Sequence, residues 1–209
     1  MSKDSLVVGI AGVFFGVLVG WIIGSQQGGR PAAPVAAPAQ ASSASAGGDQ
    51  QQAPPLDETR ASALKLTAQQ NPSDATPRID LGNMYFDAGR FSEAVDWYQQ
   101  ALAINPKDVN VSTDLGISYY YTNQPDRALT QFDRSLAIDP RHSKTLLNVG
   151  IVRAFGKQDL DGAAKAFQQV LDVAPGSAEA RAARQALDGI RSAHPDTPGG
   201  AAKQPGAPD

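Results

Sequence analysis

The chain has no cysteine and only two histidines among its 209 residues. Without cysteine it can form no disulfide bond, carry no lipid on a cysteine and build no thiolate-ligated zinc or iron–sulfur centre. The two histidines, His142 and His194, are too far apart in sequence to form a helical metal-binding pair, and we expect His142 in a solvated turn. These shortages predict a protein without metal or cofactor.

The chain also lacks an excess of positive charge and a phosphate-binding loop. Its 18 Lys and Arg residues are outnumbered by 21 Asp and Glu residues, which gives a net charge of −3, so we expect no nucleic-acid partner. Glycine pairs such as Gly28-Gly29 lie in low-complexity segments rather than between a strand and a helix. Solvated helix faces explain the carboxylates Asp80, Asp87, Asp96 and Asp114. We therefore expect no enzyme activity.

What the chain does contain is a repeat. Leu81-Gly82 recurs 34 positions later as Leu115-Gly116. The same distance separates Tyr85 from Tyr119, Ala94 from Ala128, Tyr98 from Phe132, Leu102 from Leu136, and Pro106 from Pro140. A third unit repeats Val149-Gly150, Ala163, Phe167, Leu171 and Pro175, with one extra residue near Lys157–Asp161. A repeat of this length predicts an all-α protein in which helix pairs stack into a solenoid.

The apolar residues of one unit fall into two runs with helical spacing. Gly89 separates the two runs in the first unit and allows a tight turn. Gly82 is small where the two helices must cross, and Tyr98 fills the space beside it. Pro106 ends the second helix because proline cannot continue one, whereas Pro125 opens the second helix of the next unit, where proline is tolerated.

These residues resemble the tetratricopeptide repeat. The matching positions are Leu81-Gly82-Asn83, Tyr85, Gly89, Ala94, Tyr98, Ala101-Leu102 and Pro106. The resemblance implies a right-handed superhelical solenoid of helix-turn-helix repeats with a concave face that binds other proteins. The chain departs from the family at Arg78, Ser112 and Leu146, where tryptophan is frequent, and at Arg153, where tyrosine is usual.

We expect repeats over 75–108, 109–142 and 143–177, with capping helices over 56–71 and 178–192. Ser177 is a suitable N-cap for the last of these helices. Together the segments make one repeat domain over 56–192, with eight helices and no strand.

The N-terminal part of the chain predicts a membrane anchor over 1–24. Leu6–Ile23 contains no charged residue, and its length is near the lower limit for a helix that crosses a bilayer. A cleaved signal peptide is the alternative, although its apolar region is normally shorter and has a small-x-small cleavage site close behind.

Glycines recur at every fourth position of this apolar run, at Gly12, Gly16, Gly20 and Gly24. Such a stripe lets membrane helices pack closely, so we expect the anchor to self-associate into a homo-oligomer or to bind another protein's membrane helix. The alternative is that glycine is simply common in membrane helices.

Residues 25–55 consist almost wholly of Ala, Pro, Ser, Gly and Gln, and the tail over 193–209 has a similar composition. We expect both segments to be disordered because they cannot bury enough apolar surface. Lys3 and the terminal amine precede the apolar run and Arg30 follows it, which slightly favours a cytoplasmic N-terminus. The expected location is a bacterial inner membrane, crossed once, with the repeat domain in the periplasm.

The resemblance implies that the first helix of each unit lines the concave face. By this resemblance, the partner-binding residues are Ile79, Asn83 and Phe86 in the first repeat, Asp114, Ile117, Tyr120 and Tyr121 in the second, and Lys144, Leu147, Ile151 and Phe155 in the third. Some family members hold a peptide carboxylate with Lys and Asn, but Ile79 and Asp114 replace those residues here, and an aspartate would repel the carboxylate. The remaining side chains predict an apolar or helical peptide ligand, unless they pack against neighbouring helices instead.

Two classes of function follow. The first is a membrane-tethered adaptor or scaffold that binds a partner protein or peptide, with a cytochrome c maturation subunit that presents an apoprotein as a narrower form. The second is a structural membrane protein that self-assembles through its anchor and repeats. A cell-envelope enzyme is the least favoured alternative.

Deleting residues 1–25 is expected to move the chain from the membrane fraction to the soluble fraction without unfolding the repeat domain, because the predicted anchor is lost. Fractionation and circular dichroism of the full and truncated chains measure this. A mature protein whose N-terminus maps at or after Ser25 would contradict the anchor.

Overall fold

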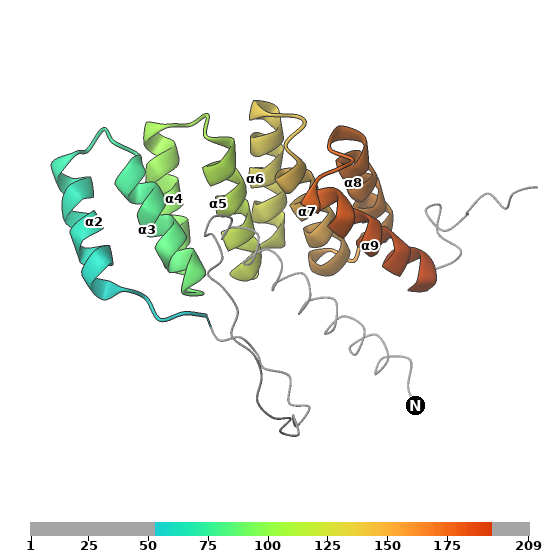
Figure 1. Cartoon of the computed structure of the whole chain (residues 1–209), viewed down its shortest axis with the longest axis horizontal. Coiled ribbons are helices and arrows are strands. Elements are labelled where there is room, and N and C mark those ends of the chain that lie inside the picture. Colours follow the sequence, from blue (N-terminus) through green and yellow to red (C-terminus); the bar gives the residue numbers. More distant parts are fainter. Residues whose placement is uncertain (1–52, 194–209) are drawn as a thin grey trace, which may run out of the picture. The chain divides into compact units, whose positions relative to one another are not determined.

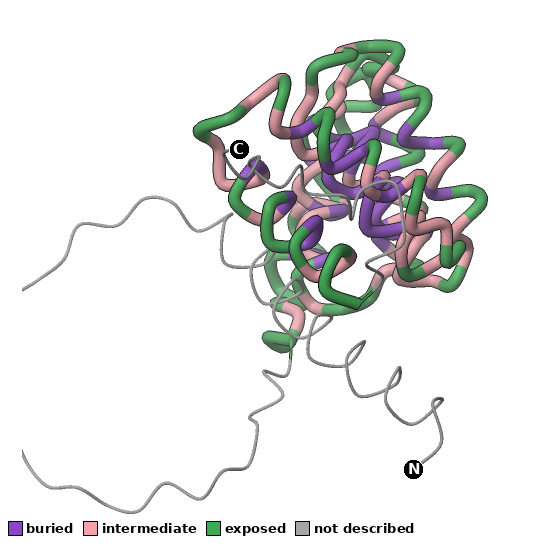
Figure 2. The backbone as a smooth tube through the Cα atoms, turned by 90° about the vertical axis from the view of Figure 1, so that its right-hand side faces the viewer, coloured by how far each residue is buried: buried purple, intermediate pink, exposed green. Residues whose placement is uncertain are grey.

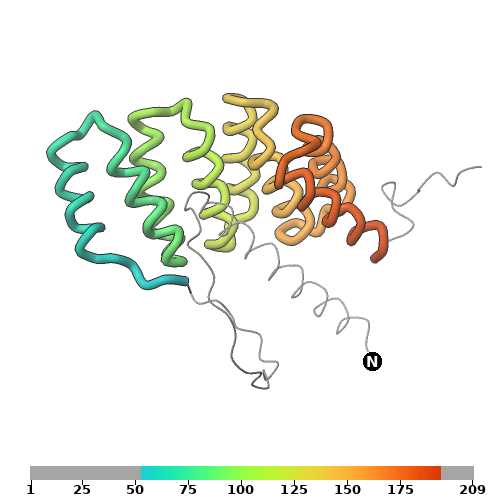
Figure 3. Tube along the Cα trace, viewed as in Figure 1, coloured from blue at the N-terminus to red at the C-terminus, as the bar shows by residue number. Residues whose placement is uncertain are grey.

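The computed structural model describes residues 53–193. This range contains eight α-helices and one π-helical turn, and no strand. Numbered as in Figure 1, the elements are α2 (Glu58–Gln70), α3 (Thr76–Asp87), α4 (Phe91–Ile104), α5 (Val109–Tyr121), α6 (Pro125–Ile138), α7 (Ser143–Ile151), η1 (Val152–Gly156), α8 (Leu160–Val173) and α9 (Ala178–Ala193). The predicted number of helices is confirmed, and Figure 3 shows how the chain winds through them in order.

The predicted anchor over 1–24, with Gly12, Gly16, Gly20 and Gly24, lies outside the described residues, as do nearly all of the predicted linker and tail. Among the helices over 53–193, none combines the length and the apolar character needed to cross a membrane. The anchor and the location of the chain therefore stay predictions.

The helices form the pairs that the repeat predicts. Helix α3 packs on α4, α5 on α6, and α7 on α8, while α4 and α6 also contact the first helix of the next pair. At the two ends, α2 packs on α3 and α9 packs on α8, as expected of capping helices. Figure 2 shows that the buried positions gather between the packed helices, with exposed positions around them.

One contact recurs inside every pair. The first helix carries a glycine where a Cβ atom would collide with an aromatic ring of the second helix. The three contacts are Gly82 with Tyr98, Gly116 with Phe132, and Gly150 with Phe167. All three rings are at most 1% exposed. Glycine is therefore needed at these positions because the ring occupies the space of a side chain.

The turn after each first helix also repeats. One residue in each turn has a positive φ angle, namely Gly89 at 71°, Asn123 at 59° and Gln158 at 56°. Glycine adopts this conformation without a steric cost, and asparagine tolerates it better than most residues. The sequence-based assignment of Gly89 to a tight turn is confirmed, and Gln158 is the strained member of the set.

Side-chain caps define several helix starts. The capping oxygens of Asp57, Asp108, Asp159 and Ser177 each accept a hydrogen bond from the backbone N–H three residues later. The Ser177 cap, on Ala180 N–H at 3.0 Å, was predicted. Such a contact supplies a partner to an N–H group that the helix itself leaves unpaired.

The third pair accommodates its extra residue by widening a helix. After α7, the turn η1 closes with a hydrogen bond from the Lys157 N–H to the Val152 carbonyl oxygen, at 3.0 Å. A residue inserted into a helix commonly produces this wider spacing. Where the first two repeats have Tyr85 and Tyr119, this repeat has Arg153, which pairs with Asp159 at 2.7 Å.

At two of the three positions where the family frequently has tryptophan, the residue found here makes specific polar contacts. The Arg78 guanidinium donates to the carbonyl oxygens of Ala68 and Asp74, at 2.9 and 2.8 Å, and so covers the C-terminal end of α2. The Ser112 hydroxyl oxygen is 2.7 Å from Gln131 Nε2 and 2.8 Å from the Ser135 hydroxyl oxygen, and all three side chains are buried. Each polar group thus has a partner in the interior.

We expect Gly116→Ala to lower the free energy of unfolding by about 1–3 kcal/mol, because the new methyl group must displace the buried Phe132 ring. Gly176→Ala is the matched control, since no heavy atom lies within 4 Å of its Cβ position. Urea unfolding of the two variants measures the difference. Equal stabilities would mean that the ring moves aside freely and that the contact does not set the helix spacing.

Candidate partner-binding face

The predicted binding residues divide into buried and accessible groups. They lie on α3, α5 and α7 with its extension η1, whose combined surface we call the first-helix face. Phe86, Ile117, Leu147 and Ile151 are core residues, with exposed fractions of 7% or less. The other seven positions are at least partly exposed, namely Ile79, Asn83, Asp114, Tyr120, Tyr121, Lys144 and Phe155. Neighbouring pairs thus cover much of the apolar stripe that the sequence predicts there.

Aromatic rings gather where α3 and α5 end. The Tyr121 ring stacks on Phe91 with centroids 4.3 Å apart and meets the edge of Phe86 at 6.1 Å. Tyr120 is tilted against Tyr121 at 5.9 Å. Burial raises the pKa of Tyr121 to about 12, so this ring stays neutral. Phe91 opens α4, and it was missed because only first-helix positions were carried over from the family.

The aromatic cluster continues toward the third repeat. A Cβ atom on Gly156 would lie 3.2 Å from the Tyr120 ring, so η1 packs closely against that side chain. Phe155, the residue before Gly156, is 36% exposed. It is one of three large apolar side chains in the described range that are classed as exposed. We call Phe91, Tyr120, Tyr121 and Phe155 the aromatic patch. These side chains offer partly exposed apolar surface, as a peptide ligand needs.

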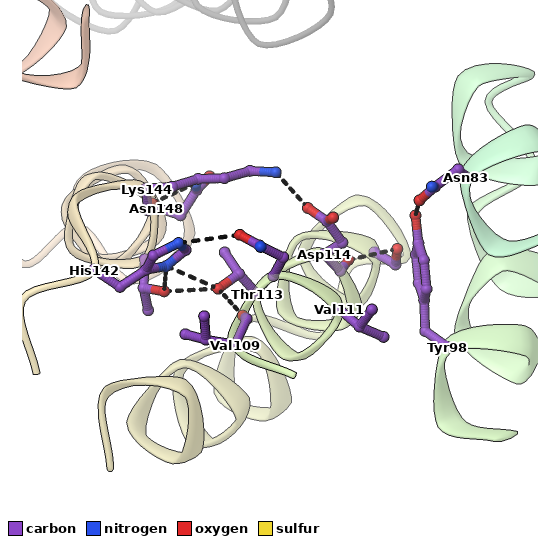
Figure 4. A network of polar contacts seen from close by, with 12 residues as sticks. Asn83, Tyr98, Val109, Val111, Thr113, Asp114, His142, Lys144 and Asn148 are labelled. Atoms are coloured by element: carbon purple, nitrogen blue, oxygen red, sulfur yellow. Dashed lines mark hydrogen bonds and ion pairs between the residues drawn. The ribbon is translucent and has the colours of Figure 1, made fainter. Parts of the chain in front are cut away.

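The centre of the first-helix face carries an ion pair (Figure 4). The Lys144 Nζ atom is 2.7 Å from Asp114 Oδ1, and the two side chains are only 27% and 14% exposed. Burial raises the pKa of Asp114, and the neighbouring Lys144 ammonium opposes that rise. The expectation of a solvated Asp114 is therefore wrong. The carboxylate is already paired, so it neither repels nor attracts a ligand as a free charge would.

Asn83 also makes a hydrogen bond within the protein. Its side-chain oxygen accepts a hydrogen bond from the Tyr98 hydroxyl, at 2.8 Å, and Figure 4 shows the tyrosine reaching it from α4. Burial raises the pKa of Tyr98, so its hydroxyl remains a donor. The Asn83 amide nitrogen is the part of the side chain that can face a ligand.

His142 links two first helices instead of standing in a solvated turn, so that expectation is wrong. Its Nδ1 atom is 2.7 Å from the Thr145 hydroxyl oxygen, and its Nε2 atom is 3.2 Å from Asn110 Oδ1. Thr145 in turn lies 2.7 Å from the Thr113 hydroxyl oxygen. Burial lowers the pKa of His142, which favours the neutral ring. The network ties α5 to α7 beside the ion pair (Figure 4).

Asp87 is a charged residue of this region that the described part of the structure leaves unpaired, as is Asp80 earlier on α3. Asp87 is the last residue of α3 and is exposed, and its side chain makes no hydrogen bond or ion pair within the described range. Partial burial raises its pKa, and the Asp114 carboxylate adds to the rise. The first-helix face therefore combines an aromatic patch, a neutralised centre and, on α3, the unpaired carboxylates of Asp80 and Asp87, with Asp87 at the helix end.

The paired polar groups and the exposed rings of this face are suited to binding another chain. Within residues 53–193, no group of three His, Asp or Glu side chains is placed to hold a metal ion. Most of the polar side chains described above bind one another, and the face also presents apolar surface and the carboxylates of Asp80 and Asp87. Such a surface can retain a peptide by burial and charge pairing.

Family models match the repeats directly. Residues 82–123 match the model described as TPR repeat, and residues 113–178 match the model described as Tetratricopeptide repeat. The chain therefore contains tetratricopeptide repeats, as the sequence resemblance indicated. No curated protein matches the chain by sequence.

Solved structures share this architecture. A crystal structure of MamA is similar with a TM-score of 0.57 and 18% identity, over 64% of this chain and 74% of that one. A second crystal structure, of MamA protein, has a TM-score of 0.56 and 18% identity, over 64% and 69% of the two chains. The Arabidopsis OM64 TPR domain has a TM-score of 0.52 and 17% identity, over 64% and 98%. At these identities the similarity shows the fold alone.

Replacing Lys144 by Met is expected to lower the free energy of unfolding by about 1–3 kcal/mol, because the mostly buried Asp114 carboxylate loses its counter-ion. Lys157→Met is the matched control. Its pair with Asp126 also measures 2.7 Å, but the two side chains are 39% and 79% exposed, so solvent screens it and we expect little change. Urea unfolding compares the variants.

Adding Asp114→Asn to Lys144→Met should recover most of the loss, since the uncompensated charge is then removed. Equal losses for the Lys144 and Lys157 variants would contradict the importance of burial for this pair.

Proposed function

We propose that the chain is a membrane-tethered adaptor whose repeats bind an apolar segment of a partner protein on the first-helix face. The tetratricopeptide repeats support a role in protein binding, and the uncharged run Leu6–Ile23 supports the tether. The bacterial inner membrane, with the repeats in the periplasm, is the location we propose with it.

The exposure of the aromatic patch carries the proposal. Phe155 is 36% exposed, and Phe91, Tyr120 and Tyr121 are only partly covered by the rest of the described chain. Burying partly exposed rings under a ligand removes apolar area from water, at roughly 25 cal/mol per Å². Aromatic side chains in this position are typical anchors of protein–protein binding.

The polar groups of the same face shape the site around this patch. The Asp114–Lys144 pair and the His142 network hold α5 against α7, so the patch is presented by helices already in place. A preformed surface costs less entropy to bind than one that must first order. The proposed ligand is therefore an extended or helical peptide laid across helices that need no rearrangement.

Phe155→Ser is expected to weaken binding by about 1–2 kcal/mol with little change in stability, because the ring is exposed and adds contact area rather than core packing. Leu66→Ser is the matched control. Leu66 is 55% exposed but lies on α2, outside the first-helix face. The ligands are peptides selected on the purified full chain from a random library displayed on phage, with dissociation constants measured by fluorescence anisotropy.

If no peptide is enriched over the bare support, the proposed peptide binding is wrong. If the Leu66 variant loses affinity and the Phe155 variant does not, the binding surface lies elsewhere on the repeats. Phe86 is unsuitable for this test because it is a core residue, and its removal would confuse binding with folding.

A further inference from the structure

We propose that the bound peptide carries an arginine that pairs with Asp87, beside the apolar residues that cover the aromatic patch. This inference rests on the proposed function, since it specifies the chemistry of the ligand for the same face. The proposed ligand is a short segment with a guanidinium group next to aromatic or aliphatic side chains, and not a purely apolar segment.

The first argument concerns the charge left over on the first-helix face. Asp114 and Lys144 neutralise each other at 2.7 Å. Asp87 has no hydrogen-bond or ion-pair partner within the described range, and the nearby Asp114 disfavours its negative charge further. A ligand cation would lie close to an unpaired carboxylate in partly desolvated surroundings, where charge pairing is stronger than in open water.

The second argument concerns the position of Asp87 on its helix. It is the last residue of α3, whose final turn contains no basic residue. The aligned peptide dipoles give the C-terminal end of a helix a partial negative charge. An aspartate at this end adds to the same sign of charge, and only a cation from outside the helix can compensate both.

The third argument selects arginine over lysine. Asp87 lies in the last turn of α3, the turn that also carries Phe86, whose ring meets Tyr121 edge-on at 6.1 Å. A guanidinium can pair with a carboxylate through two parallel hydrogen bonds and also stack on an aromatic ring, which an ammonium does less well. The patch and the carboxylate together fit a group with both properties.

The repeats already use this combination internally. The Arg90 guanidinium lies 4.8 Å from the centre of the Tyr85 ring and also pairs with Glu93 at 2.6 Å. The Arg127 guanidinium lies 4.1 Å from the centre of the Tyr119 ring. Both arginines stack on aromatic residues of first helices. Asp87 and its neighbouring rings offer the acidic and aromatic halves of the same arrangement, with the cation missing.

The test compares peptides selected from the random phage library on three full-length proteins: wild type, Asp87→Asn and Asp96→Asn. The Asp96 variant loses the same charge from an exposed position on the second helix α4. We expect wild type and Asp96→Asn to enrich peptides with arginine beside apolar residues. Asp87→Asn should still enrich apolar peptides but lose the preference for arginine.

A wild-type-selected peptide is then synthesised with its arginine replaced by glutamine, lysine or glutamate. On the wild-type protein, glutamine should weaken binding about tenfold, glutamate by more and lysine by less. On Asp87→Asn, the arginine and glutamine peptides should bind within about twofold of each other. Because the changes on the wild-type protein are made in the peptide, this arm does not depend on the folding of any variant.

Arginine-free peptides enriched on the wild type would overturn the inference while leaving the proposed peptide binding intact. An arginine preference that persists on Asp87→Asn would overturn the assignment to Asp87. Absence of any enriched peptide would instead overturn the proposed function on which the inference rests.

Discussion

The packing of one aromatic ring on one glycine, repeated in every helix pair, sets the geometry on which the rest of the domain depends. Because the rings of Tyr98, Phe132 and Phe167 occupy the space of a side chain on the facing helix, the two helices approach to a fixed distance. Each pair then presents its first helix in the same way, so residues 34 positions apart meet on one face. The proposed binding surface thus depends on core packing.

Charge pairing makes the three repeats differ in the charge that they present on the first-helix face. The second and third repeats join through Asp114 and Lys144, which removes both charges from the centre. The first repeat keeps an unpaired carboxylate at Asp87, and the third ends in the exposed ring of Phe155. Three similar units therefore differ in the charge and exposure of the side chains that they place on this face.

Helix pairs, turns and caps could be predicted from the sequence because glycine, proline and serine act through local backbone geometry, as at Gly89, Pro125 and Ser177. Which side chains of the first-helix face are buried or paired could not be predicted from the sequence. Position on a first helix gives the direction of Ile117 or Leu147 but not what the adjoining pair places over it, and both are buried. The Asp114–Lys144 pair and the His142 network join residues from different repeats, which no local pattern reports.

The polar contacts between neighbouring units differ along the array. Arg78 donates to the Ala68 carbonyl oxygen of α2, Gln99 donates to the Tyr119 hydroxyl, and Asp114 pairs with Lys144. A repeat placed in another position would leave some of these groups without partners, at a cost of about 1–3 kcal/mol for each buried one. Each unit therefore fits its own neighbour best. These contacts disfavour a change in the order of the repeats and their exchange between chains.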